Sequence, residues 1–251
     1  MNQPGLTEPR WTIRLSKWAL RLAVVALLVA AGGILLGRFD IIPKFAGFAG
    51  FAIGGLIAVI GILVALAAVV ANLRTKAGLM ASALIGLLLS AGQVGVSMSQ
   101  ASSGKGAPAI HDITTDLTNP PAFSKLALRA DNPAGVDTVG KWRELHSAAY
   151  GDLKPVVIGK PVAAVIADAD RLAKERGWDV ALADGNAGTF EATERVWWIG
   201  FEDDVIIRAV PSADGKGSTV DMRSVSRVGI SDLGVNAKRV REFLTALSSA
   251  Q

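Results

Sequence analysis

The sequence contains no cysteine and only two histidines among its 251 residues. Without cysteine, the chain has neither a disulfide framework nor thiol chemistry. The histidines, His111 and His146, are far apart and lack the paired spacing of metal ligands, so the sequence predicts no metal and no cofactor. A weak oxygen-rich site built from His111, Asp112 and Asp116 is the less favoured alternative.

The common catalytic signatures are also missing. We find no Gly-x-Ser-x-Gly elbow, no P-loop and no Gly-x-Gly-x-x-Gly run after a strand. The sequence therefore predicts no catalytic residue and argues against an enzyme. A triad of Ser224 or Ser231 with His111 and Asp203 stays open, because such groups meet only in space.

Acidic residues are scarce in the first part of the chain. Residues 1–99 hold eight Lys or Arg but only two acids, Glu8 and Asp40, whereas the remainder carries slightly more acids than bases. The net charge of +4 thus comes from bases that flank apolar runs. This distribution argues against nucleic acid as a partner, because a nucleic-acid site needs a basic patch on a folded domain.

Three apolar runs, at 18–37, 47–71 and 77–97, each approach the ~20 residues that cross a bilayer. They predict a transmembrane region of three helices over residues 18–99, after an amino-terminal segment at 1–17. No Asp, Glu, Lys or His lies deep in any run, which argues against a pump or ion-coupled transporter. The lipid bilayer is therefore an expected partner.

Basic residues predict the orientation. One side of the membrane would hold five of them and the other side three: Arg10, Arg14, Lys17, Arg74 and Lys76 against Arg38, Lys44 and Lys105. The side richer in Lys and Arg is usually cytoplasmic. We therefore expect a multi-pass protein of a bacterial inner membrane, with a cytoplasmic amino terminus and with residues 100–251 in the periplasm.

Small residues recur along the predicted spans. Gly33 and Gly37 have the spacing of close helix contacts, as do Gly50 and Gly54. The favoured interpretation is that these glycines pack the three spans on one another. The alternative is that they dock a membrane-protein partner, and a homo-oligomer also stays open.

A flexible tether is expected at 100–109, followed by a soluble domain over 110–251. Within the domain, the patterns predict a short helix near 141–149, a helix over 161–177, four strands at 178–183, 189–199, 205–211 and 218–226, and a final helix over 235–247. Consecutive strands on short turns form antiparallel sheets. The expected fold is an α+β domain: a four-stranded antiparallel sheet with two helices on one face.

The last strand predicts a polar sheet face. Asp221, Arg223 and Arg227 would point to one side and Met222 and Ser224 to the other, because side chains alternate along a strand. The favoured interpretation is cross-strand ion pairing. The alternative is an anion or lipid site, because guanidinium groups match carboxylate and phosphate. The ligand-binding candidates are Arg208, Arg223, Arg227, Asp203, Asp204, His111, Asp116 and Trp198.

Three segments carry a family resemblance: IHDITTDLTNPPAF, FEDDVIIR and VDMRSVSRVGISDLGVNAKRVREFL. They resemble the signature segments of the domain-of-unknown-function 1499 family, over about residues 108–248. The resemblance implies no reaction and assigns no catalytic role. The positions that it matches are His111, Asp112, Asp116, Pro120, Pro121, Phe123, Asp203, Asp204, Arg208, Asp221, Arg223, Ser224, Ser226, Arg227, Asp232, Gly234 and Asn236.

Three hypotheses on function follow. The favoured one is a noncatalytic accessory or scaffold subunit that presents a periplasmic α+β domain. The second is a module that binds an anionic small ligand or lipid through the arginine face and an exposed tryptophan. The third is a periplasmic hydrolase that uses His111 and the nearby acids.

Overall fold

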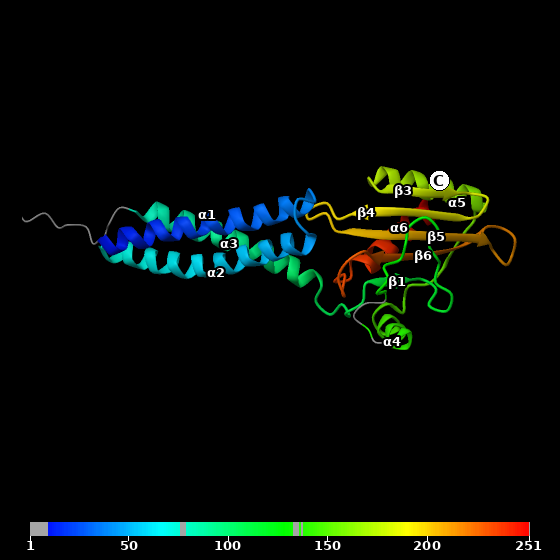
Figure 1. Cartoon of the computed structure of the whole chain (residues 1–251), viewed down its shortest axis with the longest axis horizontal. Helices are drawn as coiled ribbons and strands as arrows, with labels where there is room; N and C mark the ends of the chain where they lie inside the picture. The colour runs from blue at the N-terminus through cyan, green and yellow to red at the C-terminus, as the bar shows by residue number, and fades with distance from the viewer. Residues whose placement is uncertain (1–9, 76–78, 133–135, 137, 251) are drawn as a thin grey trace, which may run out of the picture. The chain divides into compact units, whose positions relative to one another are not determined.

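The computed structural model describes residues 10–75, 79–132, 136 and 138–250. Within them the chain divides into two compact units, one up to residue 102 together with 198–200, and one of 103–197 with 201–250 (Figure 1). Residues 1–9 of the predicted amino-terminal segment lie outside the described residues, as do Lys76 and, at the predicted start of the third span, Ala77 and Gly78.

The first unit is built from three long helices: α1 (Arg10–Arg38), α2 (Lys44–Thr75) and α3 (Met80–Ser103). Each is long and apolar enough to cross a membrane, which confirms three candidate spans. α1 begins well before residue 18, so Arg14 and Lys17 are helical. α3 includes residues 100–103, which the sequence placed in the tether.

The glycines of α1 and α2 let the two helix backbones touch. A Cβ added to Gly33 would lie 2.7 Å from the carbonyl oxygen of Gly47 and 2.9 Å from Cα of Gly50. One added to Gly54 would lie 2.6 Å from the carbonyl oxygen of Ala26, and Gly37 faces Gly47 in the same way. All four predicted glycines thus lie in the α1–α2 contact, as the packing interpretation expects. Docking of another subunit through them stays a prediction.

The second unit contains a six-stranded antiparallel sheet. Its strands are β1 (Asp112–Thr114), β2 (Val156–Ile158), β3 (Asp179–Asp184), β4 (Thr189–Arg195), β5 (Glu202–Pro211) and β6 (Ser218–Ser226). The order is β1-β6-β5-β4-β3, and β2 pairs with the start of β6 while β1 pairs with its end. The long β6 is therefore central and is partnered along almost its whole length.

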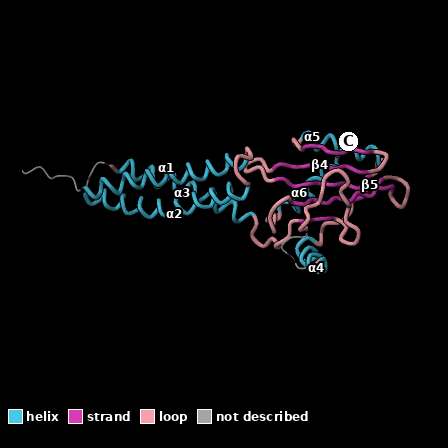
Figure 2. Tube along the Cα trace, viewed as in Figure 1, coloured by secondary structure: helices cyan, strands magenta, loops and turns pink. Residues whose placement is uncertain are grey.

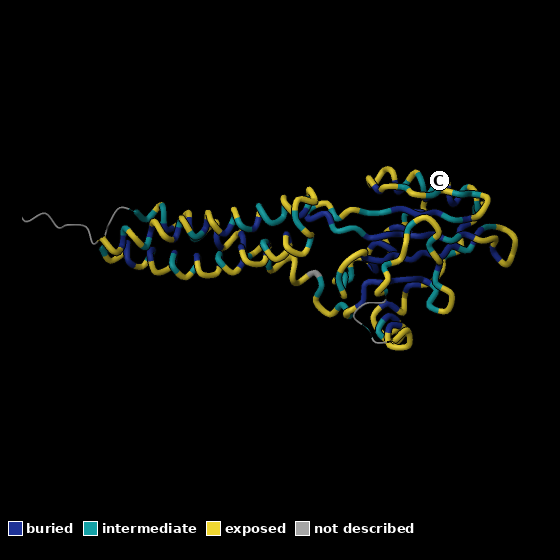
Figure 3. The backbone as a smooth tube through the Cα atoms, viewed as in Figure 1, coloured by how far each residue is buried: buried dark blue, intermediate teal, exposed yellow. Residues whose placement is uncertain are grey.

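Two helices cover one face of this sheet, as predicted (Figure 2). α5 (Val162–Glu175) packs on β3, β4 and β5, whereas α6 (Val235–Ser249) packs on β6, β1 and β2. Between the helices and the sheet lies the apolar core, in which the rings of Trp178 and Phe243 stack at 4.8 Å. Buried residues follow the strands and the inner helix faces (Figure 3).

A third helix, α4 (Val139–Tyr150), confirms the short helix expected near 141–149. It is held at the β1 edge by two polar contacts. Trp142 Nε1 donates to the carbonyl oxygen of Asp112 at 2.8 Å, and His146 Nε2 accepts from the amide of Thr114 at 3.1 Å. Burial lowers the pKa of His146, so this histidine is a neutral structural group.

Two expectations about the sheet were wrong. The sheet has six strands rather than four, because β1 and β2 are three residues long and too short to show a period. The predicted strand 189–199 ends at Arg195, because Val196 donates to the carbonyl oxygen of Phe201 at 2.7 Å and closes a turn. Both tryptophans of the pair Trp197–Trp198 therefore lie in a turn.

Candidate functional site

The sheet face opposite α5 and α6 is polar and is covered by the segment 115–132. On β6, Met222 lies in the apolar core, while Asp221 and Arg223 bond to groups on the opposite side. The predicted alternation along β6 is therefore confirmed. We call this surface, built on β1, β4, β5 and β6, the arginine face.

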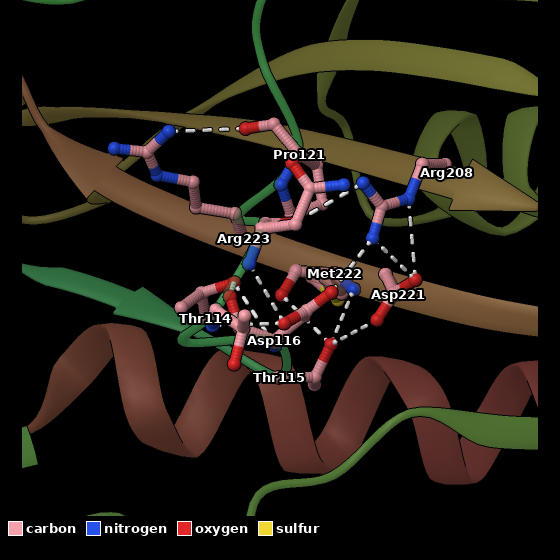
Figure 4. Close-up of polar contacts among 10 residues, drawn as sticks. Thr114, Thr115, Asp116, Pro121, Arg208, Asp221, Met222 and Arg223 are labelled. Atoms are coloured by element: carbon pink, nitrogen blue, oxygen red, sulfur yellow. Dashed lines mark hydrogen bonds and ion pairs between the residues drawn. The ribbon is translucent and has the colours of Figure 1, made fainter.

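Arg223 is the most enclosed of its three arginines. Its Nε and Nη2 donate to the two carboxylate oxygens of Asp112 on β1, at 2.9 and 2.6 Å. Its Nη1 donates to the carbonyl oxygen of Pro121 at 3.0 Å, which ties the covering segment to the sheet (Figure 4). Asn132 donates a further hydrogen bond to Asp112 at 2.6 Å. A bidentate, buried pair of this kind fixes geometry because every polar atom has a partner.

Arg208 bridges two carboxylates. It lies 2.9 Å from Asp221 on β6 and 3.1 Å from Asp116 in the covering segment, and it donates to the carbonyl oxygen of Asn119 (Figure 4). Burial would raise the pKa of Asp116, but the amides of Asn119 and Thr118 and the Arg208 guanidinium outweigh it and lower that pKa. Asp116 is thus an ionised anchor of the segment.

Arg227 lies just beyond the end of β6. It bonds to both carboxylate oxygens of Asp204, at 2.9 and 2.8 Å, to Glu202 at 2.7 Å and to the hydroxyl of Thr193 at 2.9 Å. Asp204 is nearly buried, whereas the Arg227 side chain is 41% exposed. Each of the three predicted arginines is thus bound to carboxylates of the same chain.

Glu191 on β4 binds the covering segment through backbone amides and a hydroxyl group, and sequence reasoning missed this contact. One carboxylate oxygen accepts from the amide and the hydroxyl of Ser124, both at 2.7 Å, and the other accepts from the amides of Lys125 and Leu126. Burial would raise the pKa of Glu191, but these donors, led by the Leu126 amide, lower it below its usual range. The available signal was an acid between the apolar residues Phe190 and Ala192, in the middle of a predicted strand.

Asp203 and Asp204 are adjacent in sequence but lie on opposite faces of the sheet. Asp203 points toward α6, where it accepts from Arg239 at 2.7 Å. Arg239 also bonds to Glu194, to Ser224 and to Asn236, and only 4% of its side chain is exposed. Sequence reasoning missed this second polar cluster, because an arginine on an amphipathic helix is normally assigned to the solvent side.

His111 precedes β1 and is buried. Its Nε2 lies 3.5 Å from Nη1 of Arg129, which also donates to the carbonyl oxygen of Gly229 at 2.6 Å. Burial lowers the pKa of His111, and the neighbouring Arg129 lowers it further. The imidazole is therefore neutral near pH 7.

Two pockets of about 330 Å³ open beside the arginine face. One is lined by Phe123, Leu128, Arg129, Val225 and Arg227, and it combines apolar walls with two guanidinium groups. The other lies between the covering segment and α4, with Asp116, Ser147, Tyr150 and Lys154 in its wall. Among the predicted ligand-binding candidates in the described part of the chain, Asp116 lines the second of these pockets, and Asp204 and Arg227 line the first.

The groups considered for catalysis form hydrogen bonds or ion pairs with other residues. Ser224 donates to Asn236 at 2.7 Å, Ser231 donates to the carbonyl oxygen of Pro108 at 3.2 Å, and Asp203 is paired with Arg239. Among the described residues, no group of three or more His, Cys, Asp or Glu side chains is placed to hold a metal ion. Trp198, the remaining candidate, lies half-buried in the turn after β4.

One family of known proteins matches most of the second unit. The profile of the family described as "Protein of unknown function (DUF1499)" matches residues 112–247, from the first residue of β1 into α6. No curated protein matches the chain. The matched region spans more than half of the sequence and contains the whole arginine face, so the chain belongs to the DUF1499 family of proteins of unknown function.

Proposed function

We propose that the protein is a noncatalytic accessory or scaffold subunit that presents its α+β domain on the periplasmic side of a bacterial inner membrane. Three candidate membrane spans precede the domain and would anchor it. The proposal rests mainly on one observation: the charged groups of the arginine face neutralise one another. Arg208, Arg223 and Arg227 each bond to two or more groups of the same chain.

Internal pairing favours a structural role for this face. A guanidinium that is already held by two carboxylate oxygens must lose those bonds before it binds an external anion, and that exchange is costly in a buried site. The pairs instead lock residues 115–132 onto the sheet at Asp112, Asp116 and Glu191. The result is a rigid platform whose remaining surface is free to engage another protein.

An apolar strip at the far end of the sheet offers a place for such contact. Val157 on β2 and Val210 on β5 both pair with Thr219 of β6, so the three residues lie side by side across the sheet. Val157 is 68% exposed and Val210 is 43% exposed. Two exposed valines on one sheet face, one on either side of Thr219, would give a partner protein apolar contacts.

Photo-crosslinking in intact cells tests this role. A photoreactive residue at Val157 or Val210 is expected to give one discrete heteromeric adduct, while the same residue at Ala167, on the exposed side of α5, gives none. The adduct should also co-purify in mild detergent. A chain that purifies alone and gives no adduct at either valine would contradict the proposal.

An anion-binding or lipid-binding module is the second candidate, favoured by the pocket that Phe123, Leu128, Arg129 and Arg227 line. Apolar walls with two guanidinium groups suit an anionic amphiphile. Retention of such a lipid by the purified wild type and its loss from Arg129→Gln would support this candidate. The hydrolase hypothesis has less support, because Ser224 and Asp203 are engaged with Asn236 and Arg239.

A further inference from the structure

The loop between β6 and α6 displays apolar side chains to solvent. Val228, Ile230, Leu233 and Val235 are between 37% and 59% exposed. The loop is nevertheless fixed, because the carboxylate of Asp232 accepts from the amides of Gly234 at 3.0 Å and Asn236 at 2.6 Å. These apolar side chains are therefore held outward by an ordered backbone.

Leu233 has an unusual backbone conformation. Its φ is 56°, in the left-handed region that side chains other than glycine rarely adopt. Gly234 follows with a φ of 83°, so two consecutive residues are left-handed. Glycine would adopt the conformation of Leu233 without strain. A strained position that carries an exposed leucine points to a use for the leucine side chain itself.

The loop packs against the first residues of the domain. A Cβ added to Gly104 would lie 2.5 Å from Cβ of Leu233, Ser231 donates to the carbonyl oxygen of Pro108 at 3.2 Å, and the amide of Asp232 donates to the carbonyl oxygen of Ile110 at 3.3 Å. The loop thus follows residues 104–110 closely.

Those residues follow the helix of the third candidate span. The span ends at Ser102 and its apolar run ends at residue 97, so Gly104 is seven residues beyond the apolar run. At ~1.5 Å per residue within the helix and at most ~3.6 Å per residue beyond it, Gly104 lies within about 15 Å of the end of that run. Leu233, which contacts Gly104, is therefore held near the membrane surface by the covalent connection.

The charges beside the loop suit the same environment. Lys105, next to Gly104, is exposed, and so is Lys238 in the first turn of α6. Lys238 Nζ lies 3.8 Å from a carboxylate oxygen of Glu242, and both side chains are largely exposed. Lysines beside apolar side chains are typical of segments that rest on anionic membrane surfaces.

We propose that residues 228–235 are a membrane-contact loop, whose apolar side chains enter the interface of the bilayer that holds the three helices. Lys105 and Lys238 then lie at the level of the lipid phosphates. The loop fixes the height and orientation of the domain over the membrane. This inference goes beyond the proposed scaffold role and does not depend on it.

Single-cysteine labelling tests the loop, because the full chain has no cysteine of its own. Ile230→Cys is labelled with an NBD fluorophore and reconstituted into vesicles of phosphatidylcholine and phosphatidylglycerol, with and without nitroxide-labelled lipid. Val157→Cys is the control, because Val157 is also apolar, is 68% exposed and lies on β2 at the opposite end of β6. We expect the lipid nitroxide to remove most of the emission at position 230 and almost none at position 157.

Leu233→Gly gives a second readout that separates folding from membrane contact. Glycine relieves the strain at φ 56°, so the domain should unfold at an equal or higher urea concentration. The lipid quenching of the label at position 230 should nevertheless fall several-fold. Equal quenching at positions 230 and 157 would overturn the proposal. Shielding of position 230 from aqueous iodide without lipid quenching would also overturn it, because a protein would then cover the loop.

Discussion

Replacement of Arg239 by leucine tests the buried polar cluster between the sheet and α6. The Arg239 side chain is 4% exposed and its partner Asp203 is 5% exposed, so Arg239→Leu leaves a buried carboxylate without its counter-ion. It also removes the partner of Glu194 and a donor to Ser224. Breaking a buried pair by removing one side typically costs ~3–5 kcal/mol. We expect a loss in that range for the free energy of unfolding.

A matched control lies two residues further along the same helix. Arg241 pairs with Asp152 at 2.6 Å, but the two side chains are 42% and 58% exposed. An exposed pair contributes about 0–1 kcal/mol, so Arg241→Leu should cost no more than that. The double variant Arg239→Leu, Asp203→Leu should regain part of the loss, because it removes the stranded charge.

The assay is urea unfolding of the full-length protein in mild detergent, followed by pulse proteolysis of the domain. The expected order of stability is wild type, then Arg241→Leu slightly below it, then the double variant, then Arg239→Leu. If Arg239→Leu loses no more than Arg241→Leu, the cluster does not hold α6 to the sheet, and the reasoning from burial is refuted.

Three further predictions concern other parts of the chain. The folded pKa of Glu191 lies below its ordinary value of 4.5, so the ionised carboxylate stabilises the fold above pH 4.5, and this contribution is lost as the pH falls through the folded pKa. The difference in unfolding free energy between wild type and Glu191→Gln should therefore shrink from pH 7 to pH 3 in urea unfolding, and a constant difference would contradict the shift. Gly33→Leu should destabilise the helices by about 1–3 kcal/mol in detergent through overpacking, as measured by thermal aggregation. Gly32→Leu is the control and should be tolerated, because nothing lies within 4 Å of a Cβ added there; equal effects of the two variants would contradict the α1–α2 contact. Burial, and then the charge of Asp232, raise the pKa of Tyr150 to about 12. Because Tyr150 is the single tyrosine, absorbance at 295 nm should show that midpoint in the folded protein, and a folded midpoint near 10 would contradict its burial. The stability that the neutral phenol contributes should decline as the pH rises above about 10.

Much of the fold was predictable from periodicity. The predicted strand 218–226 coincides with β6, in which Val220 and Met222 enter the apolar core at a period of two. The predicted helices 161–177 and 235–247 correspond to α5 and α6, because each buries one apolar stripe. The short strands β1 and β2 were not predictable in this way. Their pairing depends on β6, which is far away in sequence.

The candidate site was predictable in its residue types but not in its pairs. Alternation along β6 placed Arg223 and Arg227 on one face, yet it gave no partner for either. Their partners come from other elements: Asp112 from β1 and Asp204 from β5. Adjacent acids were treated as one group, whereas strand geometry sends Asp203 and Asp204 to opposite faces. Pairing across a sheet is a property of the register, which a single sequence does not specify.

The proposed periplasmic role requires the domain to lie on the far side of the membrane from the amino terminus, and cysteine accessibility measures this directly. Two single-cysteine variants are compared in bacterial spheroplasts: Ala213→Cys, in the exposed turn between β5 and β6, and Gln3→Cys near the amino terminus. We predict that a membrane-impermeant maleimide labels position 213 in intact spheroplasts and position 3 only after permeabilisation. Labelling of position 3 in intact spheroplasts, with position 213 protected until permeabilisation, would contradict it.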